Sequence, residues 1–236
     1  MSPSLAKPTV VRRLGRMLLK YCKLEGVPLV NIVRSETAAA ELKELGADHV
    51  VVSSAGSYKK DLVTAIVATK ATLGFDATGG GSLAAEIISA MEEALKINGE
   101  KPHPAYGCST HKQVYRYGGL QKGNTELPMG LGMAWGVGGW LMPFHFAKRG
   151  NEYRAASIAK AVDGLTSTFS TNYGKRVSLD EMCTGPADYL ATLESKTGQK
   201  FLVCPNGVGY PKQFPNKKRD VDCTNFQAGP LKPNSI

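Results

Sequence analysis

Arg34 and Ser35 combine residue types that suit a bound nucleotide. They lie in "NIVRSE" (31–36), where a short apolar, β-branched stretch ends in an arginine. In an open parallel sheet, ligands bind at the carboxyl ends of the strands, and an arginine after the second strand of a dinucleotide fold suits a 2′-phosphate. The pair therefore favours NADPH over NADH. The alternative is an ordinary surface arginine at a strand end.

Two further segments reach glycines where a strand is expected to finish, namely "FDATGGG" (75–81) and "YRYGGL" (115–120). Glycine permits positive φ and a close approach of the backbone to a ligand, and paired glycines at a strand end leave room for a flat ring. The alternative for each segment is an ordinary turn. Three such segments at successive strand ends favour a cofactor site, with predicted members Arg34, Ser35, Asp76, Gly79, Gly80, Tyr117, Gly118 and Gly119.

Other chemistries find less support in the residues. The four histidines lack the spacing of metal ligands. No tyrosine is followed four residues later by lysine, and neither G-x-S-x-G nor a phosphate-binding G-x-x-x-x-G-K-[ST] loop is present. The sequence therefore predicts neither a metal site nor a catalytic side chain.

Apolar periodicity places these segments on an alternation of strands and helices. Strands are expected at 28–33, 48–54, 71–81, where the strand leads into glycines, and 112–119. Helices are expected at 14–25, 36–47, 57–70 and 82–96, the last capped by Ser82. Four alternations are typical of a parallel, doubly wound α/β sheet covered on both faces.

The alternation ends after Gly119. Residues 120–150 are Gly-rich, and Trp135 and Trp140 are expected in a core or a subunit contact, with no phosphate role for "GLGMAWGVGG". A helix is expected at 151–172 and a final strand within 198–206. No packed structure is expected at 207–236, where proline repeats and lysine is in excess.

The charge of +9 belongs to the two ends of the chain. Residues 1–20 carry five Lys and Arg and no acid, residues 200–236 carry six against two acids, and 21–199 is balanced at 18 each. This distribution argues against nucleic-acid binding, which requires a clustered basic stripe.

The cysteines and the lack of a long apolar run bear on location. Five scattered cysteines without C-x-x-C spacing fit reduced thiols. No membrane span is predicted, so the cytoplasm is expected; the basic start also resembles a mitochondrial presequence.

The segments "GVPLVNIVRSE", "ELGADHVVVSS", "ATLGFDATGGG", "YGCSTHKQVYRYGGL" and "GMAWGVGGWL" follow one another in an order that resembles the medium-chain dehydrogenase/reductase superfamily. The resemblance is to its zinc-independent quinone oxidoreductase and enoyl reductase branch and covers about residues 14–204. It implies NADPH, bound between a GroES-like catalytic domain and a Rossmann domain, and hydride transfer to an activated alkene, enoyl or quinone substrate. The cofactor carries that chemistry, and the protein positions it.

The resemblance also implies that the family's catalytic domain, first Rossmann strand and glycine-rich turn have no counterpart here. The expected fold is an incomplete Rossmann-type doubly wound parallel sheet with flanking helices and disordered basic termini. The expected parts are an irregular segment (1–13), an NADPH-binding domain (14–150), a returning helix and strand (151–206) and a disordered tail (207–236). The expected function is the cofactor-binding part of a reductase, completed by a separate catalytic-domain chain or a homodimer. The alternative is a non-catalytic truncated fragment or interaction module.

Overall fold

The structure is a computed structural model that describes residues 13–170, 175–184 and 201–205. The chain divides into two compact units. Residues 13–170 belong to the first, and 175–184 with 201–205 belong to the second. The predicted irregular start, up to residue 12, and the predicted disordered tail (207–236) lie outside the described residues.

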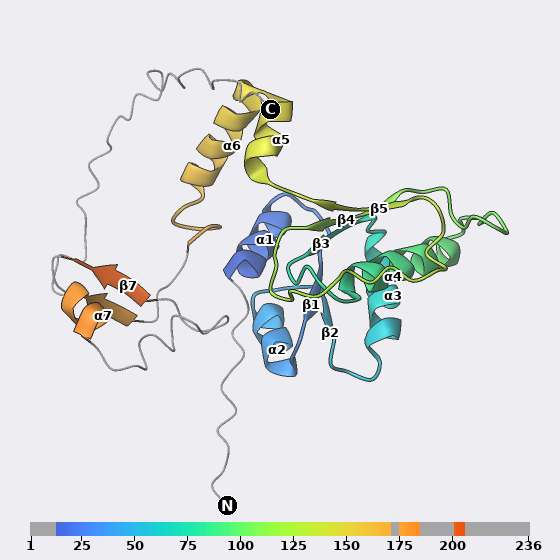
Figure 1. Ribbon diagram of the computed structural model, residues 1–236, viewed down its shortest axis with the longest axis horizontal. Helices are drawn as coiled ribbons and strands as arrows, with labels where there is room; N and C mark the ends of the chain where they lie inside the picture. The colour runs from blue at the N-terminus through green and yellow to red at the C-terminus, as the bar shows by residue number, and fades with distance from the viewer. Residues whose placement is uncertain (1–12, 171–174, 185–200, 206–236) are drawn as a thin grey trace, which may run out of the picture. The chain divides into compact units, whose positions relative to one another are not determined.

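The first unit alternates helices with short parallel strands. Helices α1 and α2 lie on one side of the strands, and α3 and α4 lie on the other (Figure 1). The predicted α/β class and doubly wound arrangement are therefore confirmed. The elements are α1 (Arg13–Leu24), β1 (Val30–Val33), α2 (Glu36–Glu44), β2 (His49–Val52), α3 (Tyr58–Thr69), β3 (Leu73–Asp76), α4 (Leu83–Ile97), β4 (Lys112–Arg116), β5 (Trp135–Gly139), α5 (Met142–Arg149) and α6 (Asn151–Asp163).

The strands of this unit form two hydrogen-bonded groups, β1-β2 and β3-β4-β5. Within the described residues, β1 pairs with β2 alone and β3 pairs with β4 alone. On β3, Leu73 is 50% exposed and Phe75 is 45% exposed, although the strands of a doubly wound sheet are normally buried on both faces. The described residues thus form the incomplete sheet that the sequence predicts.

One apolar core nevertheless joins the two strand groups. Helices α3 and α4 pack against each other and against strands of both groups, and Val30 and Ile32 of β1 contact the same cluster as Val114 of β4. The large side chains that are most buried in the cluster are Val51, Leu62, Ile88, Met91 and Val114. A smaller cluster on the other side of β1 and β2 contains Leu19 of α1 with Ala38, Leu42 and Ala47.

The Gly-rich segment 120–150 contains two elements that the sequence did not predict, β5 and α5. Three of the five residues of β5 are glycines, which lack a strand-forming side chain. Pairing with β4 holds this strand, in a register that runs from Lys112 opposite Trp135 to Arg116 opposite Gly139. Trp135 packs against the main core, in agreement with its expected place.

Ser82 occupies the predicted N-cap position of α4 but makes no capping hydrogen bond to the helix backbone. Its hydroxyl instead donates to Glu86 Oε1 at 2.7 Å. Ser35 caps α2, because its extended backbone lets Oγ accept from the Ala38 N–H at 3.3 Å.

Helix α6 is shorter than predicted and ends at Asp163, where turns lead to Phe169. This region contacts α1 at the opposite end of the unit's sequence. Lys160 pairs with Glu25 at 2.6 Å, and the ring of Phe169 stacks on Tyr21 with centroids 5.9 Å apart. Segments far apart in the chain therefore pack together.

The described part of the second unit is a pair of parallel strands with one short helix. Its elements are β6 (Lys175–Ser178), α7 (Leu179–Thr184) and β7 (Phe201–Cys204). The predicted final strand is confirmed as β7, whereas β6 was not predicted. Val177 of β6 is fully buried.

Candidate functional site

The carboxyl ends of β3, β4 and β5 lie side by side, since their last residues are register partners. Asp76 is opposite Arg116, and Arg116 is opposite Gly139. This is the edge of a parallel sheet at which ligands bind. The predicted residues around Asp76 and Tyr117 thus meet at one edge.

Asp76 is buried, and its carboxylate holds the turn that follows β3. Oδ1 accepts from the backbone N–H of Thr78 at 2.7 Å and from its hydroxyl at 2.6 Å, while Oδ2 accepts from the Gly79 N–H at 3.2 Å. These bonds fix the start of the glycine segment, so Asp76 shapes the strand end. A direct contact between Asp76 and a cofactor stays a prediction.

Two of the predicted glycines are required by the packing of one strand end on the other. Gly79 has φ +88°, and a Cβ there would lie 2.5 Å from the Gly118 carbonyl oxygen. A Cβ on Gly118 would collide with the Ala77 carbonyl. Gly80 is also buried, against the backbone of Gln121 and Gly123. The two glycine segments therefore pack backbone to backbone and form the floor of the strand-end edge.

A cavity of about 450 Å³ opens beside this floor, at the ends of β4 and β5. We call it the aromatic pocket; its lining is Arg116, Tyr117, Gly118, Gly119, Gly139, Trp140, Leu141 and Phe144. Aromatic faces beside glycine backbone suit the stacking of a flat ring. The pocket brings together the predicted residues Tyr117, Gly118 and Gly119, and it adds residues of β5 and α5 that the sequence did not assign to a site.

Arg116 is the charged residue of the aromatic pocket and was missed by the sequence argument. One guanidinium nitrogen, Nη1, donates to the Gly79 carbonyl at 3.1 Å and to Thr125 Oγ1 at 3.2 Å. Thr125 donates to the same carbonyl at 2.9 Å. The available signal was its place directly before the Tyr-Gly-Gly segment at a strand end.

Arg34 and Ser35 follow β1, the strand next to β2. Arg34 is exposed, and no carboxylate of the described residues forms an ion pair with it. Ser35 is engaged as the cap of α2, so its side chain has a structural role. An unpaired guanidinium beside a helix N-terminus suits a phosphate, and the role of both residues in binding stays a prediction.

A second cavity, of about 310 Å³, lies between α3, α4 and the segment 128–131. Tyr58 donates to Glu86 Oε2 at 3.0 Å on its wall. Burial raises the pKa of Tyr58, and the negative charge of Glu86 adds to the effect. This cavity shares no lining residue with the aromatic pocket and holds none of the predicted cofactor-binding residues.

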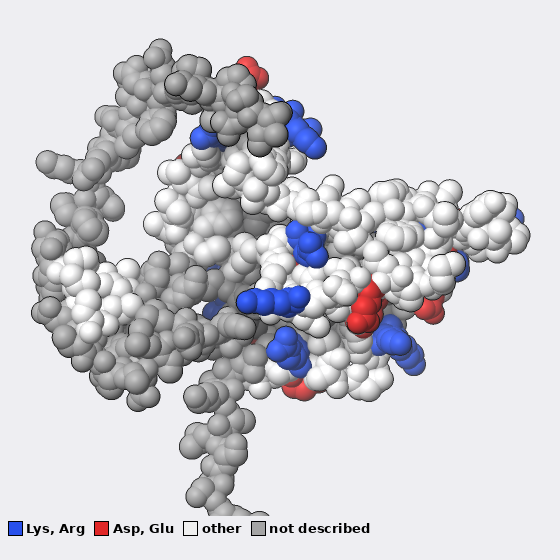
Figure 2. Space-filling view, in the orientation of Figure 1, with Lys and Arg blue, Asp and Glu red and all other residues white. Residues whose placement is uncertain are grey.

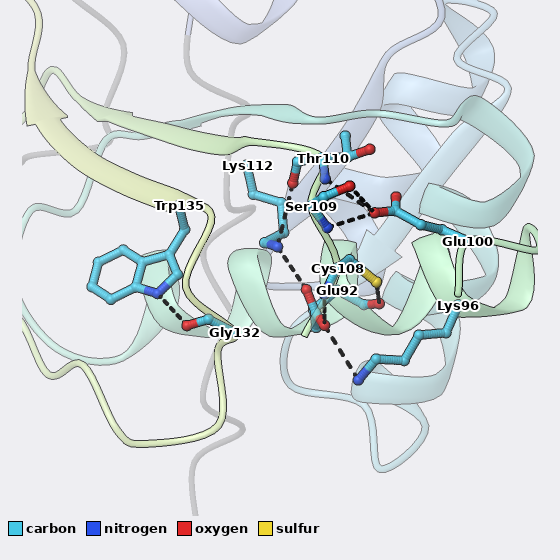
Figure 3. Close-up of polar contacts among 9 residues, drawn as sticks. All are labelled: Glu92, Lys96, Glu100, Cys108, Ser109, Thr110, Lys112, Gly132 and Trp135. Carbon is cyan, nitrogen blue, oxygen red and sulfur yellow. Dashed lines mark hydrogen bonds and ion pairs between the residues drawn. The ribbon is translucent and has the colours of Figure 1, made fainter. Parts of the chain in front are cut away.

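The amino end of β4 carries a buried ion pair that the sequence did not predict (Figure 3). Lys112 Nζ lies 2.6 Å from Glu92 Oε2, and both residues are almost fully buried. The Cys108 N–H donates to Glu92 Oε1 at 2.9 Å, and the more exposed Lys96 approaches that oxygen at 3.3 Å. This network fastens α4 to β4 and to the segment before it.

The environment of Glu92 favours its charged form. Burial alone would raise the pKa of Glu92, but the hydrogen bonds from Lys112 and from the Cys108 N–H, together with the charge of Lys112, outweigh it and lower the pKa to about 2. The hydrogen bonds from Thr110 and Ser109 likewise lower the pKa of Glu100. The network is therefore internally satisfied, as a structural ion pair requires.

Basic and acidic side chains are interspersed on the face shown in Figure 2.

Among the described residues, no group of histidine, cysteine and acidic side chains could hold a metal ion. None of the helices in the described part of the chain is long and apolar enough to cross a membrane.

Parallel strands, helices on both sides and a pocket at the strand ends define a Rossmann-like α/β unit. Neither a protein-family model nor a curated protein matches the sequence. The structure is similar to a protein described as an NADPH:quinone reductase from Mesorhizobium loti, with a TM-score of 0.59 and 21% identity over 80% of this chain and 49% of that one. It is also similar to a mutant enoyl thioester reductase from Candida tropicalis, with a TM-score of 0.56 and 16% identity over 84% and 54% of the two chains.

A quinone oxidoreductase from Pseudomonas syringae gives a TM-score of 0.50 and 16% identity over 81% of this chain and 53% of that one. These similarities confirm the predicted Rossmann-like fold. The chain spans about half the length of these structures.

Proposed function

We propose that this chain is the cofactor-binding part of an NADPH-dependent oxidoreductase of the quinone or enoyl reductase type. The observation that supports it most is the aromatic pocket at the carboxyl ends of β4 and β5, in a fold shared with NADPH:quinone and enoyl thioester reductases. A neighbouring enoyl thioester reductase structure contains NADP and crotonyl-CoA.

In this proposal the two ends of the cofactor lie at different strands. Arg34 contacts the 2′-phosphate, with the start of α2 at Ser35 beside it. Tyr117, Gly118 and Gly119 line the place of the nicotinamide ring, and the turn held by Asp76 and the packing of Gly79 and Gly80 keep that edge in shape. NADPH, when bound, supplies the hydride, and the protein's own residues bind and orient it.

The substrate of the proposed reductase is an activated alkene, an enoyl compound or a quinone. We assign no catalytic side chain to the described residues, so the proposal includes a partner that supplies the substrate-binding surface. That partner is a separate catalytic-domain chain or a second copy of this chain; one neighbouring structure is a mitochondrial heterodimer. The cytoplasm stays the predicted location, with the mitochondrion as the alternative.

The second candidate is a non-catalytic fragment or interaction module of the same fold. It is favoured by the two strand groups, because within the described residues β1 and β3 each pair along one edge only. An unpaired strand edge is a template for association with another chain. Such a module would keep the fold without binding the cofactor.

Calorimetric titration of the full chain with NADPH and with NADH separates the two candidates. Arg34→Ala should weaken NADPH binding by ~1–3 kcal/mol and leave NADH binding nearly unchanged, because a charge-assisted contact to the 2′-phosphate is lost. Lys43→Ala, on the last turn of α2, is the control for net charge. Equal losses for both cofactors would exclude the 2′-phosphate role, and no binding of either cofactor to the folded chain would favour the second candidate.

A further inference from the structure

Arg116 places a positive charge in a pocket that is otherwise aromatic, aliphatic and glycine. Its side chain donates to the Gly79 carbonyl and to the Thr125 hydroxyl, which are both neutral and both engage the same nitrogen, Nη1. No carboxylate of the described residues forms an ion pair with Arg116. The guanidinium is therefore held in place without being neutralised.

The acidic residue opposite Arg116 on the neighbouring strand is already engaged. Asp76 is the register partner of Arg116 on β3, but its carboxylate accepts from Thr78 and Gly79 and is buried in their turn. Gly139, the partner on β5, has no side chain and itself lines the pocket. The space beside Arg116 is thus open toward the pocket.

A fixed guanidinium with free donors binds phosphate or carboxylate oxygens in preference to neutral groups. We infer that Arg116 is a specificity-determining residue, which gives the aromatic pocket a preference for a flat-ring ligand that carries an anionic group beside the ring. The ring lies against Tyr117, Trp140 and Phe144, and the anion meets Arg116. This inference deepens the proposed function and rests on it for the choice of ring.

The test compares nicotinamide mononucleotide with nicotinamide riboside, which lacks the phosphate, by ligand-detected NMR titration of the full chain. The unmodified protein should bind the mononucleotide about 10- to 100-fold more tightly, the range expected of a hydrogen bond to a charged group. Raising the salt concentration should shrink this ratio because the contact is partly exposed. A second comparison, of the affinities for nicotinate and for nicotinamide, reports whether a carboxylate on the ring is recognised instead of a phosphate.

Arg116→Gln should bring the ratio of the two affinities close to one. Thr125→Val removes a neutral partner of the same guanidinium and keeps the charge, so it should preserve the ratio. Arg154→Gln, on α6 and outside the pocket lining, is the charge control. A ratio unchanged in Arg116→Gln, a ratio abolished equally by Thr125→Val, or no binding of any of the four ring compounds to the unmodified chain would overturn the inference.

Adenosine 2′,5′-bisphosphate separates this inference from the proposed function. Its binding should depend on Arg34 and not on Arg116. If it fails to bind while the mononucleotide binds in an Arg116-dependent way, the inference holds and the NADPH proposal fails. If it binds through Arg34 while Arg116→Gln leaves the mononucleotide ratio unchanged, the NADPH proposal stands and the inference is wrong.

Discussion

Strand β4 carries a cation at each end, and the two ends differ in almost every respect. At its amino end, Lys112 is fully buried and paired with Glu92 at 2.6 Å. At its carboxyl end, Arg116 is exposed, forms no ion pair with a carboxylate of the described residues and lines a pocket. A cation neutralised by the protein holds the fold together, whereas a cation left without a counter-charge is available to a ligand.

The comparison predicts its largest effect at the buried end. Lys112→Ala should lower the free energy of unfolding by ~3–5 kcal/mol, because the carboxylate of Glu92 is left buried without its partner. Urea unfolding followed by circular dichroism measures the loss. The double variant Glu92→Leu, Lys112→Met should recover most of it, since an apolar pair of similar size needs no counter-charge. A double variant as unstable as the single one would contradict this account.

Acid should act on the same end of the strand. The pKa of Glu92 is lowered from 4.5 to about 2 in the folded protein, so its charged form contributes stability that is complete above pH 4.5 and is lost as the pH falls toward 2. The shift corresponds to about 3 kcal/mol. The free energies of unfolding of the unmodified chain and of Glu92→Gln, measured between pH 2 and 6, should therefore converge at the acid end. A difference between the two proteins that does not change with pH would refute the linkage.

At the carboxyl end, a smaller effect is expected from the backbone packing. Gly118→Ala should cost ~1–3 kcal/mol, because the added methyl group collides with the Ala77 carbonyl. Gly119→Ala is the matched control, since nothing lies within 4 Å of a Cβ there, and it should change stability by less than ~0.5 kcal/mol. Thermal unfolding compares the two. Equal costs would mean that the close approach of the glycine segments is not required.

The smallest expected effect on stability tests whether burial decides how much an ion pair to Glu92 contributes. Lys96 reaches the same carboxylate as Lys112, at 3.3 Å, but its side chain is 46% exposed. Lys96→Ala should therefore cost only ~0.3–0.5 kcal/mol, as expected of an exposed i,i+4 pair. Urea unfolding beside Lys112→Ala provides the comparison. A loss as large as that of Lys112→Ala would show that exposure does not distinguish the two lysines.

The sequence predicted the α/β alternation because apolar periodicity is local and helices α1 to α4 follow it closely. It missed β5, since "WGVGG" has little strand propensity and is held by pairing with β4. It placed Ser82 correctly at the start of α4 but not its hydroxyl, which bonds to Glu86 instead of to the helix backbone. These errors arise where a distant or side-chain partner decides the conformation.

Part of the candidate site could also be predicted from the sequence. Tyr117, Gly118 and Gly119, which line the pocket, were predicted because the ends of strands can be recognised in the sequence. Trp140 and Phe144 could not be placed there, since their position depends on β5 and α5. The Glu92–Lys112 pair spans 20 residues between a helix and a strand, and no periodic pattern marks it.

The contact between α6 and α1 bears on the order in which the chain can fold as it is made. Lys20 of α1 donates to the Ser167 carbonyl, 147 residues further along the chain, and Tyr21 stacks on Phe169. At a synthesis rate of ~5–20 residues per second, α1 is made roughly 7–30 s before these partners exist. During that interval Tyr21 lacks its stacking partner Phe169, and the packing of α1 is completed only when residues 160–170 have been made.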